Sequence, residues 1–203
     1  MNCYIFDLDG TLLDSRHAML SIFDQIALED GVKPNLDDGW EGFISLGGIE
    51  LINYVFNGCK DNKQRLNRFR RKYLNIKHQK RDFYKGALEY LEKIHSRNQV
   101  FLVTNKPRAI VEKILYEVDA MRFFSNIWCR GDSGLVKPSQ ELANYILFRL
   151  RQNVDEIWLY GDSFADRNLA SMIKGCIYMH HENGFEPASE SDRVFKYEDF
   201  SNV

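Results

Sequence analysis

A chain of 203 residues is long enough for one hydrophobic core, or for a core domain with a smaller insertion. Hydrophobic residues make up 44% and charged residues 28% of the chain, which is ordinary for a globular protein and argues against disorder. A net charge of −2 gives no reason to expect nucleic acid or an anionic membrane as a partner. Because the sequence has neither an apolar run of roughly 18 residues nor a basic N-terminal region, we expect no transmembrane helix and no signal peptide, and a cytoplasmic location.

Short apolar segments alternate with helical patterns along most of the chain. Segments this short and this continuously apolar are typical of strands buried on both faces of a parallel sheet. The alternation of strand and helix predicts an α/β fold, a Rossmann-like doubly wound parallel sheet. The expected strands are 3–6, 100–103, 127–129, 157–160 and 176–179, with 194–195 as one more short strand, and the expected helices are 86–97, 107–119, 139–151 and 163–174.

Residues 15–84 interrupt this alternation. They contain no convincing strand, and their patterns predict helices at about 16–29, 48–56 and 61–76. A crossover between parallel strands needs only about a dozen residues, so this segment is too long for one. We therefore expect an inserted α-helical cap domain at 15–84 and an α/β core made of 1–14 and 85–203.

The four cysteines are far apart and form no CxxC pair. Three of them lie in apolar, strand-like surroundings. This pattern favours buried free thiols over disulfides or a metal site. The cysteines are Cys3, Cys59, Cys129 and Cys176.

Polar residues follow four of the predicted strands. In a parallel sheet the carboxyl ends of the strands share one edge, and ligands bind at that edge in open α/β sheets. Four groups that are far apart in sequence are therefore expected to converge in space. They are Asp7 with Asp9, Thr104 with Asn105, Lys137 before Pro138 and after a turn at 131–134, and Asp162 with Asp166 in Gly161-Asp162-Ser163-Phe164-Ala165-Asp166.

The types of residue in these groups suggest a chemistry. The carboxylates of Asp7, Asp9 and Asp162 would repel one another unless a cation lay among them, and an oxygen-rich site suits Mg²⁺. A lysine, a threonine hydroxyl and backbone N–H groups at helix starts suit a phosphate. Carboxylates, Mg²⁺ and phosphate together imply phosphoryl transfer. Phosphate-monoester hydrolysis can require an acceleration of about 10²¹-fold, which calls for covalent, metal and electrostatic catalysis together.

With these motifs the chain resembles the haloacid dehalogenase superfamily, specifically its phosphatases with a helical cap. The first motif, DxDGT, matches Asp7-Leu8-Asp9-Gly10-Thr11. The setting of Thr104, in Val103-Thr104-Asn105-Lys106-Pro107, looks like that of the phosphoglycolate phosphatases. Lys137 matches the third motif, and Gly161-Asp162 with Asp166 matches the fourth, GDxxxD. The resemblance extends to about Gly175, over the cap by position and helicity only.

The resemblance implies roles for the first motif. Asp7 would attack phosphorus and become an aspartyl phosphate, and Asp9 would serve as general acid and then as general base. For both acids to reach one substrate, the chain must bend after Phe6, with Gly10 and Thr11 supporting the turn. The dehalogenase branch lacks the second acid, since halide leaves without a proton, so Asp9 favours phosphate chemistry.

The resemblance also implies roles for the other motifs. Mg²⁺ would be held by Asp7, the backbone carbonyl of Asp9, and Asp162, with Asp166 supporting the metal site. Thr104 and the Asn105 N–H would bind phosphoryl oxygens. Lys137 would offset charge on the nucleophile and the phosphate.

The expected function is hydrolysis of a small phosphorylated metabolite by a Mg²⁺-dependent phosphatase, with phosphoglycolate as the first candidate. A phosphosugar mutase like β-phosphoglucomutase is the alternative enzyme, and the motifs do not separate the two. A catalytically idle binding or regulatory module is the alternative of another class; it would show loss of the nucleophile, acid or lysine, and none is lost. We expect a monomer or homodimer with no nucleic-acid or membrane partner.

Several features have plainer interpretations. The aspartates could cap turns and helices, and Lys137 could be a solvated loop lysine. His180 and His181 are adjacent, so their side chains should point different ways rather than share a metal. The turn at Gly47-Gly48 could enter the active site or simply begin a helix. A basic run is expected to be a solvated helix face rather than a nucleic-acid or polyanion site; its members are Lys60, Lys63, Arg65, Arg68, Arg70, Arg71, Lys72, Lys77, Lys80 and Arg81.

Overall fold

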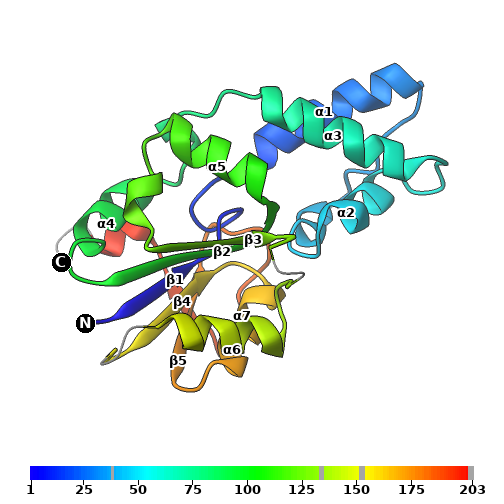
Figure 1. The fold of residues 1–203 in the computed structure, drawn as a ribbon. Coiled ribbons are helices and arrows are strands. Elements are labelled where there is room, and N and C mark those ends of the chain that lie inside the picture. The colour runs from blue at the N-terminus through cyan, green and yellow to red at the C-terminus, as the bar shows by residue number, and fades with distance from the viewer. Residues whose placement is uncertain (38, 133–134, 151–153, 201–203) are drawn as a thin grey trace.

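The computed structural model describes residues 1–37, 39–132, 135–150 and 154–200. Their strands form one parallel sheet in the order β3-β2-β1-β4-β5-β6 (Figure 1). The chain order reverses at β1, which pairs with β2 on one side and β4 on the other, and ligands bind at such switch points. The strands are β1 (Cys3–Phe6), β2 (Gln99–Pro107), β3 (Asn126–Arg130), β4 (Ile157–Gly161), β5 (Cys176–His181) and β6 (Arg193–Phe195).

Helices cover both faces of the sheet, so the core has three layers (Figure 1). Successive side chains of a strand point to opposite faces, and in β1 Ile5 packs with the α6 and α7 side while Phe6 packs with the α4 and α5 side. Phe6 also stacks on Tyr160, its partner on β4, with ring centroids 4.8 Å apart. The helices are α4 (Ala87–Ile94), α5 (Arg108–Glu117), α6 (Gln140–Arg149) and α7 (Phe164–Met172), with short 3₁₀ helices at Met121–Phe123 and Tyr197–Phe200.

The predicted α/β fold with a doubly wound parallel sheet is confirmed, including the short strand at the C-terminal end. The helices α4, α5, α6 and α7 of the core are all shorter than predicted. The α5 helix stops before Asp119, which has a positive φ of 58°, and α7 stops before Gly175, where φ is 77°. The ring of His95 donates from Nδ1 to the carbonyls of Leu91 and Glu92, where α4 ends. Residues 133–134 of the predicted turn and Arg151 of a predicted helix lie outside the described residues.

The largest correction concerns β2, which extends to Pro107 rather than ending at Val103. Thr104 and Asn105 therefore lie within the strand and not after it. The pairing with β3 shifts between Thr104, which pairs with Cys129, and Pro107, which pairs with Arg130. Such bulges re-aim side chains and are common beside active sites. Asn105 and Lys106 form this irregular stretch.

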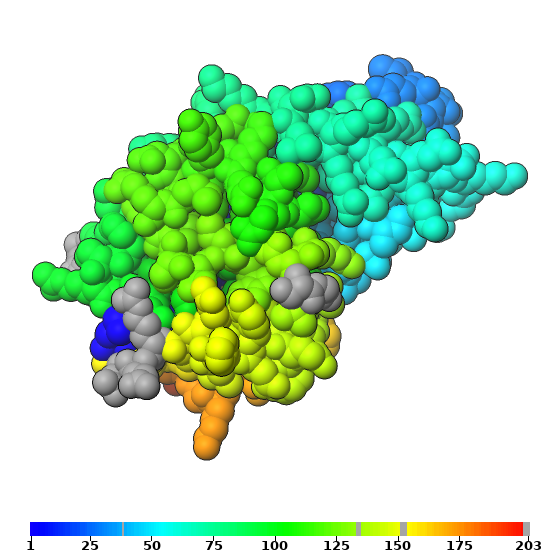
Figure 2. Space-filling model, in the orientation of Figure 1, coloured from blue at the N-terminus to red at the C-terminus, as the bar shows by residue number. Residues whose placement is uncertain are grey.

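Residues 15–84, called the insertion below, contain helices joined by loops and turns and lie between β1 and β2 in sequence. Its helices gather at one end of the sheet, and α3 lies against α5 on the face seen in Figure 2 (Figures 1 and 2). Phe23 of α1 stacks on Phe69 of α3 at 5.3 Å and meets Trp40 edge-on at 5.7 Å. The helices are α1 (Arg16–Asp30), α2 (Gly48–Val55) and α3 (Asn62–Asn75), with 3₁₀ helices at Trp40–Phe43 and Lys80–Asp82.

The basic run is only partly the solvated face that the sequence predicts. Lys63 and Arg71 are exposed as expected. Arg65 is buried, and with Arg68 it pairs with Asp30 at the end of α1, at 2.7 and 2.6 Å. These cations hold two helices of the insertion together, because α1 ends in carboxylates opposite them.

Cys3 and Cys129 are buried free thiols, as expected, and Cys59 and Cys176 are half-buried free thiols. Burial raises the pKa of the Cys3, Cys129 and Cys176 thiols to about 12. Among the helices in the described ranges, none is both long and apolar enough to cross a membrane.

Candidate active site

A pocket of about 310 Å³ lies at the switch point, outside the carboxyl ends of β1, β2 and β4. The backbone N–H of Asp7 donates to Tyr160 O at 2.9 Å, which fixes the end of β1 against β4. The structure brings all the predicted site residues together around this pocket. Asp7, Asp9, Thr104, Asn105, Lys137 and Asp162 line it, and Gly10, Thr11 and Asp166 lie directly behind.

The turn after β1 bends as the sequence analysis requires. The backbone N–H groups of Leu12 and Leu13 both donate to Leu8 O, at 2.9 and 2.8 Å, and Gly10 adopts a positive φ of 78°. This turn carries Asp9 back toward the pocket that Asp7 lines. A side chain at Gly10 would place its Cβ 2.0 Å from Asp162 Oδ2, so only glycine allows the turn to approach the acid.

Asp7, Asp162 and Asp166 form a buried acidic cluster. A carboxylate oxygen from each lies within 4.8 Å of the others. Burial, assisted by the charge of Asp166, raises the pKa of Asp7 to about 7, although Lys137 opposes this. Burial and the charges of Asp166 and Asp7 likewise raise the pKa of Asp162. Three buried carboxylates without an adequate counter-charge fit a hard divalent cation with oxygen ligands.

The three acids are not equally available to a metal. Both oxygens of Asp166 are engaged: Oδ1 accepts from Lys137 Nζ at 2.5 Å, and Oδ2 accepts from Ser163 Oγ at 2.5 Å in the capping box of α7. Asp162 accepts one weak bond from Thr11 Oγ1, at 3.3 Å, and one from the backbone N–H of Phe185, at 2.7 Å. Asp7 Oδ1 is buried and its one charged contact is the ammonium of Lys137, at 2.7 Å. Asp7 and Asp162 are thus less fully engaged by neighbouring groups than Asp166 and are the better candidates to bind a cation.

Lys137 supplies the positive charge of this cluster. Its Nζ lies 2.7 Å from Asp7 Oδ1 and 2.5 Å from Asp166 Oδ1, and the side chain is 2% exposed. Burial opposes its charge, but the two carboxylates outweigh burial and raise the pKa of Lys137. It is therefore a permanent cation next to the carboxylate of Asp7.

Asn105 holds Lys137 in place with its side chain. Asn105 Oδ1 accepts from the backbone N–H of Lys137 at 2.9 Å, and Asn105 Nδ2 donates to the carbonyl of Lys137 at 2.7 Å. The same Nδ2 donates to the carbonyl of Ser45 in the insertion, at 2.8 Å. From the sequence, only the backbone N–H of this residue was expected to act in the site, because nothing local reveals which distant loop a side-chain amide will meet.

Lys106 is a site residue that the sequence analysis did not single out. Its buried Nζ contacts both carboxylate oxygens of Asp9 at 2.7 Å and lies 4.5 Å from the centre of the Tyr73 ring, on α3. Burial opposes the charge, but Asp9 outweighs it and raises the pKa of Lys106. The available signal was a lysine between Asn105 and Pro107, directly after the apolar segment of β2.

The segment after β5 also reaches the site, which the sequence analysis did not foresee. Phe185 donates to Asp162, as described above. Glu186 accepts from the backbone N–H of Phe164 at the start of α7, at 2.7 Å, and from Ser45 Oγ of the insertion, at 3.0 Å. Glu186 thereby links the insertion to the core beside the pocket.

His180 and His181 make different contacts, as predicted for adjacent residues in a strand. His180 Nε2 lies 3.0 Å from the carbonyl of Glu186, and His181 Nδ1 lies 2.9 Å from the carbonyl of Gly10. His181 therefore supports the turn after β1. Burial lowers the pKa of His181 to about 4, so it is neutral near pH 7.

Comparisons with known proteins identify the family of this chain. The model of the family described as haloacid dehalogenase-like hydrolase matches residues 4–174. The chain is 26% identical to a phosphoglycolate phosphatase of Vibrio parahaemolyticus, over 98% of this chain and 92% of that protein. It is 28% identical to a phosphoglycolate phosphatase of Aliivibrio fischeri, over 92% of this chain and 87% of that protein. The chain belongs to the haloacid dehalogenase-like hydrolases.

Solved structures share the fold. A predicted phosphoglycolate phosphatase from Haemophilus somnus superposes with a TM-score of 0.82 at 23% identity, covering 98% of this chain and 96% of that one. The HAD-hydrolase YfnB of Bacillus subtilis, in a form bound to magnesium, gives a TM-score of 0.75 at 19% identity, with the same coverage of each chain. At these identities the likeness shows the fold, and the chemistry must be argued from the site.

Proposed function

We propose that this chain is a Mg²⁺-dependent phosphatase that hydrolyses a small phosphorylated metabolite through an aspartyl phosphate. The observation that carries the proposal is the position of Asp7: it is buried, lies 2.7 Å from the cationic Lys137, and faces one pocket together with Asp9. Membership of the haloacid dehalogenase-like hydrolases and the phosphoglycolate phosphatases among its relatives support it.

In the first step, the Asp7 carboxylate attacks phosphorus, and the bond from phosphorus to the substrate's ester oxygen breaks. Asp9 donates a proton to that oxygen, so the product leaves as an alcohol. In the second step, Asp9 takes a proton from water, which attacks phosphorus and breaks the bond to Asp7. Inorganic phosphate leaves, and both acids return to their starting state.

Other residues would stabilise the charge that develops. Thr104 and the Asn105 N–H would bind phosphoryl oxygens, and Lys137 would offset negative charge on Asp7 and the phosphate. Asp7, Asp162 and the Asp9 backbone carbonyl would hold Mg²⁺, with Asp166 orienting Lys137. The metal would supply a Lewis acid that offsets charge on the phosphoryl oxygens.

The insertion would act as a cap domain on a core of residues 1–14 and 85–203. Its contacts with the site edge, from Ser45 to Asn105 and Glu186, support this role. A closed cap would exclude bulk water from the aspartyl phosphate and would contact the part of the substrate beyond the phosphate. Phosphoglycolate is the first substrate to test, because several relatives carry that name.

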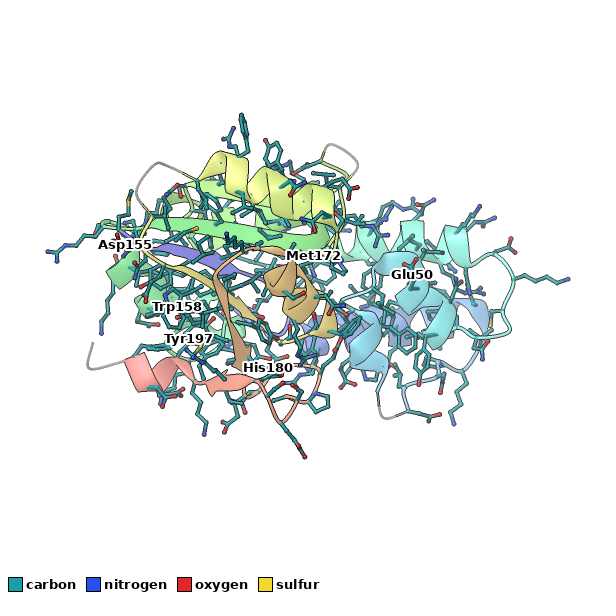
Figure 3. All side chains as sticks on the ribbon, turned by 90° about the horizontal axis from the view of Figure 1, so that it is seen from below. Glu50, Asp155, Trp158, Met172, His180 and Tyr197 are labelled. Carbon is teal, nitrogen blue, oxygen red and sulfur yellow. The ribbon has the colours of Figure 1, made fainter. Side chains whose placement is uncertain are left out.

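Turnover of p-nitrophenyl phosphate with Mg²⁺ tests the proposal. We expect Asp7→Asn to lower kcat by at least about 10³-fold, because the amide is no nucleophile. Asp155→Asn is the matched control, because Asp155 is exposed and distant from the insertion. Figure 3 shows Asp155 at one end of the molecule and Glu50, which belongs to the insertion, at the other. EDTA should silence the wild-type protein and Mg²⁺ should restore it.

Undiminished turnover by a folded Asp7→Asn protein, checked by circular dichroism, would remove Asp7 as the nucleophile. The mutase alternative has its own test, incubation with a hexose 1-phosphate and a bisphosphate primer. Isomerised product without free phosphate would contradict the hydrolase proposal.

A further inference from the structure

A second pocket lies beside the catalytic one and shares Asp9, Asn105 and Lys106 with it. It is the larger of these two pockets. It lies between the insertion and the ends of β2 and β3. Because Asp9 would protonate the leaving oxygen, the pocket that opens from Asp9 is where the alcohol part of the substrate would lie.

The walls of this second pocket are mainly apolar. An apolar wall disfavours a strongly hydrated group but favours a hydrocarbon segment, because burying that segment removes apolar surface from water. The glycolate part of phosphoglycolate has one CH₂ group between its oxygen and its carboxylate, so it would leave most of this wall uncovered. The apolar lining comes from Met19, Leu51, Leu66, Phe69, Tyr73 and Ile110.

Two arginines also line the pocket, Arg70 from α3 and Arg130 from the end of β3. Arg70 is half-buried and makes no hydrogen bond or ion pair with any residue in the described ranges, although Arg68 and Lys72 on the same helix both pair with carboxylates of α1. A half-buried cation beside an apolar wall lacks both full hydration and a counter-ion. It is therefore positioned to bind an anion.

Arg130 is held by the loop that precedes α2. Its Nη1 donates to the carbonyl of Leu46 at 3.0 Å. A Cβ on Gly47 would lie 1.4 Å from the same Nη1, so the absence of a side chain at Gly47 makes room for the guanidinium. The Gly47-Gly48 turn therefore does both things considered from the sequence: it borders this pocket, and it begins a helix. Arg130 has no carboxylate partner in the part of the chain that the structure describes.

We infer that the substrate is a phosphomonoester whose alcohol part has an apolar segment followed by a second anionic group, which Arg70 and Arg130 bind. This inference rests on the proposed phosphatase function and names the substrate class of that site. Guanidinium groups bind carboxylates and phosphates through paired hydrogen bonds, so either anion fits. One arginine comes from the insertion and the other from the core, so the anion would also join the two across the pocket.

Four substrates separate the features of this class: hexyl phosphate, 6-phosphonooxyhexanoate, hexane-1,6-diol bisphosphate and phosphoglycolate. All are alkyl phosphates, so the leaving oxygen is chemically similar in each. We expect kcat/KM for 6-phosphonooxyhexanoate or the bisphosphate to exceed that for hexyl phosphate and for phosphoglycolate by at least about tenfold. The better of the two identifies the second anion as carboxylate or phosphate.

Arginine variants test the site itself. Arg70→Gln and Arg130→Gln should each lower kcat/KM for the preferred substrate by about tenfold, mainly through KM, and change that for hexyl phosphate by less than about twofold. Arg71→Gln is the matched control, because Arg71 is the exposed neighbour on the same helix and should leave all four values unchanged. Circular dichroism checks the fold of each variant. The comparison of the four substrates uses wild-type protein, so it tests the inference even if a variant does not fold.

Equal or better turnover of phosphoglycolate or hexyl phosphate would overturn the inference, as would an equal loss on all four substrates in the arginine variants. The proposed function fails separately, if wild-type protein with Mg²⁺ does not hydrolyse p-nitrophenyl phosphate. If the protein hydrolyses that ester but shows no preference for 6-phosphonooxyhexanoate or the bisphosphate, this inference alone is overturned.

Discussion

At Gly10 the backbone turn and the acidic cluster occupy neighbouring space. The residue has φ of 78°, and a Cβ there would lie 2.0 Å from Asp162 Oδ2. Asp162 cannot move away freely, because Thr11 and Phe185 donate hydrogen bonds to its two oxygens. Any side chain at this position would therefore displace a carboxylate that we propose as a metal ligand.

Gly10→Ala should cost about 1–3 kcal/mol of unfolding free energy and lower turnover of p-nitrophenyl phosphate by at least about tenfold. Gly31→Ala is the control, because Gly31 has a similar φ of 63° but open space around it. It should cost about 1 kcal/mol and leave activity unchanged. Equal activities of the two variants, with urea denaturation confirming that both fold, would show that Asp162 tolerates the crowding.

At the scale of elements, the pair of helices α1 and α3 illustrates the difference between buried and exposed charge. Asp30 binds the buried Arg65 at 2.7 Å, and its own side chain is 17% exposed. Glu29, its neighbour, is 43% exposed and binds Arg68 and Lys72 at the surface. Removing Asp30 would leave a guanidinium with little access to water, whereas removing Glu29 would leave solvated cations.

Asp30→Ala should therefore lower the unfolding free energy by about 2–4 kcal/mol, and Glu29→Ala by less than about 1 kcal/mol. Urea denaturation of the two variants measures the difference. Similar losses in both would mean that the pairs between α1 and α3 are equally solvated, contrary to the packing described above.

The elements also show how far sequence patterns reach. The strands could be predicted because buried parallel strands need continuous apolar segments, and Asp7 and Asp162 could be placed because they follow β1 and β4 directly. The extent of β2 could not, since its last residues are polar and form an irregular pairing with β3. Lys106 was missed for this reason: its partner, Asp9, is brought near only by that irregular stretch and the turn after β1.

The rest of the site depends on contacts between distant segments. Glu186 reaches Ser45 only because the chain returns over the site between β5 and β6, which no local pattern encodes. The orientation of Arg70 is set by the packing of α3 on α1, which uses the neighbouring cations for ion pairs. Sequence motifs thus predicted the residues proposed to react with phosphate, and tertiary packing determined those that would contact the remainder of the substrate.

For the whole molecule, the buried histidine His181 predicts how stability depends on pH. Burial lowers its pKa from 6.5 to about 4 in the folded protein. The unfolded chain therefore binds this proton at higher pH than the folded chain does. The contribution of His181 is fully present above pH 6.5 and is lost as the pH falls from 6.5 toward 4.

The wild-type protein should lose about 2–3 kcal/mol more unfolding free energy than His181→Gln between pH 7.5 and pH 4.5. Urea denaturation of both proteins at the two pH values measures this difference. His17→Gln, at an exposed position on α1, should behave like the wild-type protein. Parallel losses in wild type and His181→Gln would contradict the burial of a neutral imidazole.

The central claim is that Asp7 carries the phosphoryl group between the two steps. In Asp9→Asn the general base is lost, so hydrolysis of the aspartyl phosphate should slow and the intermediate should accumulate. Acid quenching of this variant with a reactive aryl phosphate and Mg²⁺, followed by peptide mass spectrometry, detects it directly. The account predicts the added mass of one phosphoryl group on the peptide containing Asp7, and none in the double variant with Asp7→Asn. Substrate turnover with no phosphorylated peptide, or with the phosphoryl group on another residue, would contradict it.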